Sequence, residues 1–258
     1  MRRFARILLI GLMLTAAACS SLPVRDTITQ TSTIDALLAG AYDGNMTCAD
    51  LLRHGDLGIG TFDRLDGEMV LMDGCVYQVK ADGRVYTPAA SLKTPFAAVC
   101  AFDADHRVAF DQGADFAAVQ RTLDKLAPNQ NLFCAISIQG LFSRMHTRSV
   151  PAQDKPYPPL AEVTRHQPEF VMENIAGRIV GFRCPAYVKG INVPGYHLHF
   201  LSDDRTRGGH ILGFEMAEGQ CAVDVCHRFL LLLPENDETF GAADLTMDRA
   251  KELEAVEK

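Results

Sequence analysis

The sequence lacks any block of like charge, any internal repeat and any low-complexity tract. Its 258 residues carry a formal charge of −7, and no clustered basic stripe indicates a nucleic-acid partner. The hydrophobic fraction of 48% is ordinary for a globular protein and excludes extended disorder. The length is sufficient for one large domain or two small ones.

The sequence also lacks a C-x-x-C motif, although it contains eight cysteines. Seven of them follow Cys19, which is an odd number. Several lie in apolar runs, such as Cys100 in AAVCAF and Cys134 in LFCAIS, where a free cysteine behaves as a small hydrophobic side chain. An exported protein could form disulfides, and Cys221 and Cys226 are the nearest pair, but the sequence favours no specific bridge.

The hydrophobic run near the N-terminus is too short to span a bilayer as a mature helix. Three arginines precede it and small residues follow it, which predicts a signal peptide over residues 1–18. Cys19 then resembles the lipidated cysteine of a bacterial lipobox, although Ala16 leaves ordinary secretory cleavage as the alternative. We therefore expect export, to the periplasm or as a lipoprotein, and a Ser- and Thr-rich tether over residues 19–33.

The remaining chain predicts an α+β fold with a mixed or antiparallel, sheet-rich, two-lobed architecture and a few peripheral helices. The Pro-rich stretch VPAQDKPYPPL separates an N-terminal sheet-rich lobe, 34–155, from a C-terminal metal-binding lobe, 156–258. We expect the strand at 144–150 to pair with the strand before it. Helices are expected at 33–40, 47–54, 115–126, 160–166 and the C-terminus, and strands at 68–72, 75–80, 96–102, 132–142, 144–150, 169–174, 177–183 and 221–233.

The stretch GYHLHFLSDDRTRGGH, residues 195–210, holds three of the eight histidines. Side chains alternate along a strand, so His197 and His199 should project from one face, about 7 Å apart. The polar loop at 203–209 could return His210 beside them on a partner strand. Three imidazoles without a nearby cysteine are typical of catalytic zinc, although imidazole also binds iron, nickel and copper. The alternative is a hairpin with solvent-exposed histidines, and spacing alone does not decide.

Four collinear segments resemble the bacterial α-acetolactate decarboxylases. They are HGDLGIGTFDRLDGEMVLMDGCVYQV (54–79), LFCAISIQGLFSRMHTRSVPAQ (132–153), GRIVGFRCPAYVKGINVPGYH (177–197) and the histidine hairpin. The similarity extends over roughly residues 33–258. It implies decarboxylation of (S)-2-acetolactate to (R)-acetoin and CO2, with Zn2+ held by His197, His199 and His210. It also implies a homodimer joined through sheet edges.

The same resemblance implies further site residues. Glu68 and Arg148 are its acidic and basic partners, and Thr61 lies nearby. The tail ELEAVEK supplies another glutamate, which aligns at Glu257, with Glu254 as the alternative.

Decarboxylation of a β-keto acid gives these groups a chemical purpose. A divalent cation can accept electrons through the keto oxygen, which gives a metal-stabilised enediolate. Arg148 would orient the carboxylate, and Glu68 with the tail glutamate would supply the proton. Taken without the resemblance, Arg148 shares strand parity with Arg144 and His146, which favours a solvated strand face. Glu68 directly follows an Asp-Gly turn, which favours a surface acid.

Two other functions remain open from the sequence. The fold could act on a different branched 2-hydroxy-3-keto acid, or the chain could be a non-catalytic metal-binding lipoprotein. A metal buffer has no need for a guanidinium or an acid at the open side of the metal. Arg148 and Glu68 therefore favour the enzyme.

Overall fold

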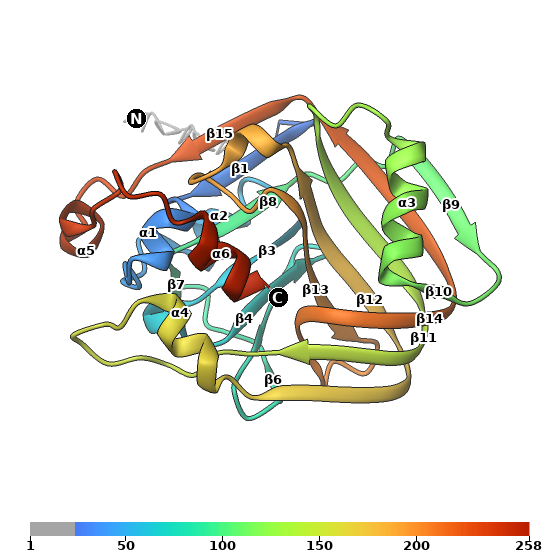
Figure 1. Cartoon of the computed structure of the whole chain (residues 1–258), viewed down its shortest axis with the longest axis horizontal. Helices are drawn as coiled ribbons and strands as arrows, with labels where there is room; N and C mark the ends of the chain where they lie inside the picture. The colour runs from blue at the N-terminus through green and yellow to red at the C-terminus, as the bar shows by residue number, and fades with distance from the viewer. Residues whose placement is uncertain (1–23, 258) are drawn as a thin grey trace, which may run out of the picture.

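The computed structural model describes residues 24–257 and builds them around two β-structures that face each other (Figure 1). The first is a seven-stranded mixed sheet, here called the open sheet, in the order β15-β1-β8-β3-β4-β5-β6. Its strands are β1 (Thr27–Thr31), β3 (Leu57–Thr61), β4 (Glu68–Met72), β5 (Cys75–Val79), β6 (Val85–Tyr86), β8 (Ala97–Cys100) and β15 (Arg228–Leu232). The α+β, sheet-rich expectation is confirmed.

The second β-structure closes on itself. Strands β11 (Phe133–Arg148), β12 (Glu169–Cys184), β13 (Gly195–Ser202) and β14 (Gly208–Cys226) pair antiparallel in the order β14-β11-β12-β13, and β13 pairs again with β14. These four strands, here called the barrel, surround an apolar core that includes Phe142, Phe200 and Phe214. Strands β9 (His106–Phe110) and β10 (Ala114–Asp115) add to β14.

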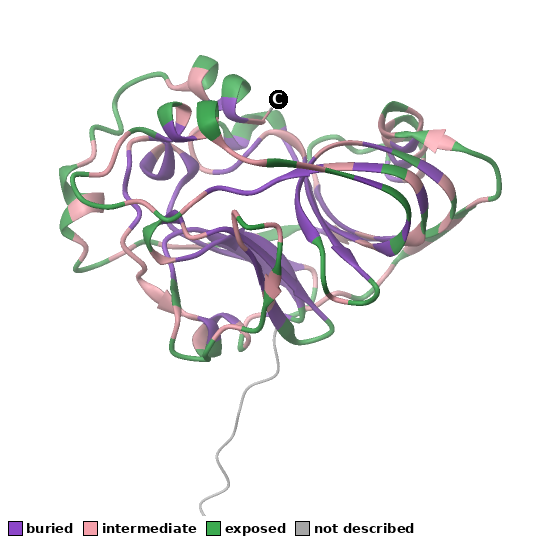
Figure 2. Cartoon of the chain, turned by 90° about the horizontal axis from the view of Figure 1, so that it is seen from below, coloured by how far each residue is buried: buried purple, intermediate pink, exposed green. Residues whose placement is uncertain are grey.

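Alternation along β13 sends its side chains to two different cores. Leu198 and Phe200 face the barrel core, whereas Leu201 packs in a second core with Val70 and Val79 of the open sheet. The two β-structures bury this second core between them, where the strands of Figure 2 are coloured as buried. The odd-numbered residues of β13 therefore face the open sheet.

A group of short helices covers one end of the space between the β-structures. Helices α1 (Ile34–Leu38), α4 (Leu160–Val163) and α6 (Ala250–Glu257) share an apolar cluster and are here called the helical cap (Figure 1). The Thr33 hydroxyl accepts from the Ala36 N–H and begins α1, as its position in the sequence predicted. Helix α3 (Phe116–Leu126), capped by Asp115, packs against the barrel instead.

The remaining elements are short. They are α2 (Cys48–Leu51), α5 (Glu238–Ala242), the 3-10 helices η1 (Asp63–Leu65), η2 (Thr164–His166) and η3 (Ala186–Val188), and the strand pair β2 (Met46–Thr47) and β7 (Lys93–Thr94). No helix of the described residues is both long and apolar enough to cross a membrane. The seven cysteines after Cys19 are free thiols, six of them buried, with only Cys75 exposed.

Several expected boundaries were wrong. Residues 144–150 do not pair with the preceding strand, because Phe133–Arg148 is one continuous strand. The tether predicted over 19–33 ends earlier, since Thr27–Thr31 forms the buried strand β1. The chain also does not divide at residue 155. Strand β11 belongs to the barrel with the later strands, and β15 returns to the open sheet beside β1. Residues 1–23, which include the expected signal peptide and Cys19, lie outside the described residues.

Candidate active site

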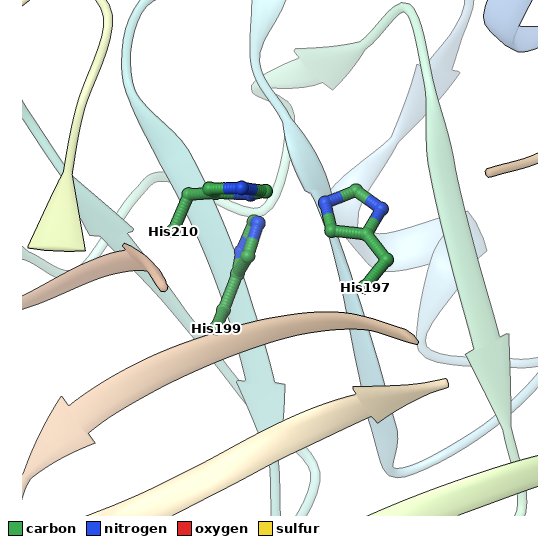
Figure 3. A group of neighbouring side chains, drawn as sticks. All are labelled: His197, His199 and His210. Atoms are coloured by element: carbon green, nitrogen blue, oxygen red, sulfur yellow. The ribbon is translucent and has the colours of Figure 1, made fainter. Parts of the chain in front are cut away.

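The three histidines of the hairpin converge on one point (Figure 3). Their candidate ligand nitrogens all lie within 4.8 Å of one another. His199 on β13 is the direct cross-strand partner of His210 on β14, and His197 lies two residues before His199 on the same face. All three are buried, at 8%, 1% and 2% exposure for His197, His199 and His210. The interpretation as a solvent-exposed hairpin was therefore wrong.

The hydrogen bonding of His199 indicates what the cluster can hold. Its Nδ1 lies 2.7 Å from the carbonyl oxygen of Met69, an acceptor, so Nδ1 must carry the proton. The lone pair of Nε2 then points into the cluster, and this buried atom has no hydrogen-bond partner. A carbonyl that fixes the tautomer of a ligating histidine is typical of metal sites. The three nitrogens thus fit a divalent cation.

The electrostatics of the cluster favour neutral imidazoles. Burial, together with a smaller effect of the nearby Arg148 guanidinium, lowers the pKa of His197 to about 3. Burial also holds the pKa values of His199 and His210 well below the usual range. Neutral imidazole is the form that binds a metal ion, so the ligands require no deprotonation at neutral pH.

Glu68 opens β4 and faces the same point from the open sheet. Its Oε2 lies 3.6 Å from Nε2 of His199, and its Oε1 accepts a hydrogen bond of 2.9 Å from Nη1 of Arg148. Burial raises the pKa of Glu68 to about 7, an effect that Arg148 opposes and Glu257 reinforces. A carboxyl with this pKa can both hold and release a proton at neutral pH. Glu68 is 5% exposed, so the surface-acid interpretation was wrong.

Thr61 positions Glu68 and does not itself contact the histidine nitrogens. It is the cross-strand partner of Glu68, and its hydroxyl donates to the Gly67 carbonyl oxygen at 2.7 Å. Gly67 has φ +87°, and a Cβ there would lie 2.3 Å from the Val79 carbonyl oxygen, so the tight turn requires glycine. Thr61 therefore holds the turn that aims Glu68 at the histidines.

Arg148 ends β11 and lies directly opposite His210 on β14. The pairing of β11 with β12 runs without a shift from Arg144 to Arg148, so Arg144, His146 and Arg148 do share one face, but Glu68 of the open sheet and Val256 of α6 cover that face at Arg148. Arg144 is exposed, whereas Arg148 is 4% exposed. Nη2 of Arg148 donates to the Val256 carbonyl oxygen at 3.1 Å, and its buried Nε has no partner. The guanidinium thus joins both β-structures to the C-terminal helix.

Glu257, at the end of α6, completes the group. Its Oε2 lies 3.9 Å from Nε2 of His210, and burial raises its pKa to about 7 against the opposing effect of Arg148. Glu254, the alternative from the tail sequence, is exposed and does not line the cavity. The structure thus brings together all seven residues that the sequence singled out.

Beyond these groups, an apolar wall that the sequence did not predict lines the cavity. Its residues come from the helical cap, the open sheet and the segment that follows β11. No local sequence motif connects these three regions. The free space amounts to about 40 Å³. Its apolar lining residues are Ile34, Leu37, Leu65, Phe96, Val150, Leu160 and Val256.

The hairpin loop orients the histidine strands from outside the site. The Asp204 carboxylate accepts from the hydroxyls of Ser202 and Thr206, and from the Thr206 N–H. Asp203 accepts from the Gln139 amide on the neighbouring β11. These bonds fix the return of β14 toward β13, and neither aspartate lines the histidine cavity.

A buried group of three histidines that could hold a metal ion, with an arginine and two carboxyls beside it, is an arrangement typical of metal-dependent enzymes. Comparison with known proteins then gives the family. Residues 28–247 match the family model described as alpha-acetolactate decarboxylase. The chain belongs to the alpha-acetolactate decarboxylase family and is a carboxy-lyase.

Individual relatives agree with this assignment. The chain is 47% identical over 233 residues to the alpha-acetolactate decarboxylase of Methanosarcina mazei, covering 90% of this chain and 81% of the relative. It is 44% identical to that of Methylococcus capsulatus, covering 88% and 87%. The crystal structure of the Bacillus subtilis strain 168 enzyme superposes with a TM-score of 0.87 at 37% identity, covering 90% of this chain and 99% of that one.

Proposed function

We propose that this enzyme uses Zn2+, held by His197, His199 and His210, to convert (S)-2-acetolactate to (R)-acetoin and CO2. The observation that carries the proposal is the unpartnered Nε2 of His199, aimed into a buried group of neutral imidazoles. Catalytic zinc uses three protein ligands and leaves positions for substrate. A cation there would supply an electrophile that draws electrons from the breaking C–C bond toward the keto oxygen.

Arg148 would bind and orient the substrate carboxylate. A guanidinium presents parallel N–H donors that match the two oxygens of a carboxylate. Its buried Nε has no hydrogen-bond partner, and Arg148 lies opposite His210. Its N–H donors would therefore lie beside the proposed metal position. The apolar wall would receive the alkyl groups and exclude water, which strengthens each electrostatic contact.

The two glutamates would handle the proton. Decarboxylation leaves a carbon that must gain a proton on one face, and a single chiral product requires delivery from one side only. Glu68 lies beside His199 and Glu257 beside His210, so the two carboxyls approach from different elements. Their raised pKa values, each about 7, leave a substantial protonated fraction at neutral pH.

Metal analysis combined with chiral product analysis tests this proposal. Protein lacking residues 1–19 should contain stoichiometric zinc and convert racemic acetolactate to CO2 and (R)-acetoin. Zinc-loaded protein that releases no acetoin would contradict the function. Activity that is restored to the apo-protein by another divalent ion, and not by zinc, would contradict only the metal identity.

We also propose that the protein is exported, with Cys19 lipidated, and that it forms a homodimer through a sheet edge. The leader sequence supports export. The edge strand β15, with Leu230 exposed, offers unpaired backbone groups for a second copy. Mass spectrometry of the mature N-terminus tests the first proposal, and light scattering of the purified protein tests the second. An intact leader or a monomer would reject them respectively.

A further inference from the structure

The groups that would bind substrate are buried beneath α6. His199, His210, Arg148 and Glu68 are at most 5% exposed. Val256 and Glu257 of α6 line the same cavity as these groups, so α6 covers the path to them. Side chains on the wall, such as Ile34, Leu65 and Phe96, are at most 3% exposed. Some part of the wall must therefore move in each catalytic cycle.

The two β-structures are poor candidates for that movement. His199, His210 and Arg148 lie on barrel strands that pair on both sides, and Glu68 lies on a strand between two others. Displacing any of them breaks ladder hydrogen bonds and the core between the sheets. Opening of such segments approaches the cost of global unfolding.

Helix α6 is attached differently. No described residue from Leu233 to Glu257 belongs to a strand, and most residues from 233 to 250 are not buried. The helix packs through Leu253 and Val256 against α1 and α4. One end is joined to the body by the exposed ion pair between Lys189 and Asp248, at 2.9 Å.

The other end is held by a bond that substrate would disturb. The Val256 carbonyl oxygen accepts from Nη2 of Arg148, the guanidinium proposed to receive the substrate carboxylate. A carboxylate is a stronger acceptor for a guanidinium than a neutral carbonyl is. Substrate arrival at Arg148 would therefore compete with the contact that keeps α6 in place.

We propose that α6 is a hinged lid, which opens to admit substrate and on closing returns Glu257 to the metal site. The hinge is the strand-free segment between β15 and α6. The Arg148–Val256 contact holds the lid closed when the site is empty of substrate. The turnover test of the lid rests on the proposed function. The metal-release test does not require that the protein decarboxylates acetolactate.

Cross-linking the lid tests the proposal. In a Cys75→Ser background, which removes the exposed native thiol, Lys189→Cys and Asp248→Cys are joined by a short bis-maleimide with a reducible internal disulfide. We expect turnover to fall about tenfold or more, and zinc release to a chelator to slow by a similar factor, both restored by reductant.

A matched control uses another ion pair, Arg178 with Asp73 at 2.8 Å, which lines a different cavity. The Arg178→Cys and Asp73→Cys pair, cross-linked in the same way, should change neither rate. The single cysteine variants at 189 and 248, capped with N-ethylmaleimide, measure the loss of the ion pair alone. Unchanged turnover and unchanged zinc release after cross-linking at 189 and 248 would overturn the lid.

Hydrogen exchange on the unmodified protein provides a second measurement. Amides of α6 should exchange much faster than those of β11, and faster than those of α3, a helix capped by Asp115 and packed on the barrel. If α6 exchanges as slowly as β11, the lid is wrong. If the protein makes no acetoin before any cross-link, the proposed function fails, while zinc release and exchange still decide the lid.

Discussion

The site is assembled from two kinds of support that differ in rigidity. Six of its seven polar groups come from β-strands, and four of these, His199, His210, Arg148 and Glu68, pair with a neighbouring strand on both sides. The seventh, Glu257, comes from an eight-residue helix at the end of a strand-free segment. Under the proposed function, metal retention and carboxylate binding would depend on the β-structures, whereas closure and one proton source would depend on the tail.

The largest expected effect comes from removing a strand-borne ligand. His199→Ala should abolish stoichiometric zinc and lower kcat/KM on the order of 10³-fold, because the metal supplies several kcal/mol of transition-state stabilisation. Metal analysis and an acetoin assay measure the two effects. His146→Ala is the control, since His146 lies on β11 but pairs with Glu169 away from the site. Full zinc content in His199→Ala would show that the rings do not share one ion.

Arg148 contacts both the β-structures and the C-terminal helix. Its removal should therefore distinguish the effect on zinc content from the effect on activity. Arg148→Ala should keep zinc near the parent content and lower activity by about 10²–10³-fold, the usual cost of losing a donor to developing charge. Arg148→Lys should recover little, because an ammonium cannot present the paired N–H donors. Loss of zinc together with activity would show that Arg148 has a structural role, through its contacts with Glu68 and α6.

Glu257→Gln changes only the tail-borne group. The amide keeps the size of the side chain but cannot transfer a proton, so kcat should fall by about 10²-fold with zinc retained. Glu254→Gln on the same helix is the matched control and should leave kcat unchanged. If Glu254→Gln had the larger effect, the assignment of Glu257 to the site would be wrong.

The smallest effect concerns stability away from the metal. Asp224 on β14 is fully buried and accepts from the Asp103 N–H, and burial raises its pKa to about 6. An acid whose folded pKa exceeds its unfolded pKa binds more protons when folded. Its stabilising effect is therefore complete below the unfolded pKa near 4 and is lost as pH rises to about 6.

Asp224→Asn should remove that dependence, which amounts to at most about 3 kcal/mol. Urea unfolding of the metal-free parent and variant, compared between pH 4 and pH 8, measures the difference. The free energy of unfolding of the variant should increase relative to that of the parent as pH rises through this window, and the difference should persist at higher pH. A difference that does not vary with pH would contradict the buried, protonated carboxyl.

The predictability of the site follows the same division between local and long-range structure. The hairpin and the shared face of His197 and His199 could be predicted because strand alternation is a local rule. The burial of Arg148 could not, since it depends on Glu68 of the open sheet and Val256 of α6, which are distant in sequence and cover the end of β11. The apolar wall combines segments from residue 34 to residue 256, whose meeting no local pattern records.

Errors in the fold have similar causes. The stretch TITQT resembled a tether in composition, yet β-branched threonine also suits a strand, and only its neighbours β8 and β15 make it one. The Pro-rich stretch near residue 155 marked a real change of direction. It did not mark a domain boundary, because β11, which precedes it, pairs with the later strands β12 and β14, and β15, which follows it, pairs with β1.

The parallel pairing of β1 with β15 has a consequence for how the chain is made. Thr27–Thr31 is synthesised well before Arg228–Leu232, its partner in the sheet. Until the ribosome has passed residue 232, β1 keeps a bare edge that can recruit strands from other chains. A product truncated before this point would leave that edge permanently unpaired, so early termination should yield aggregates rather than a smaller folded protein.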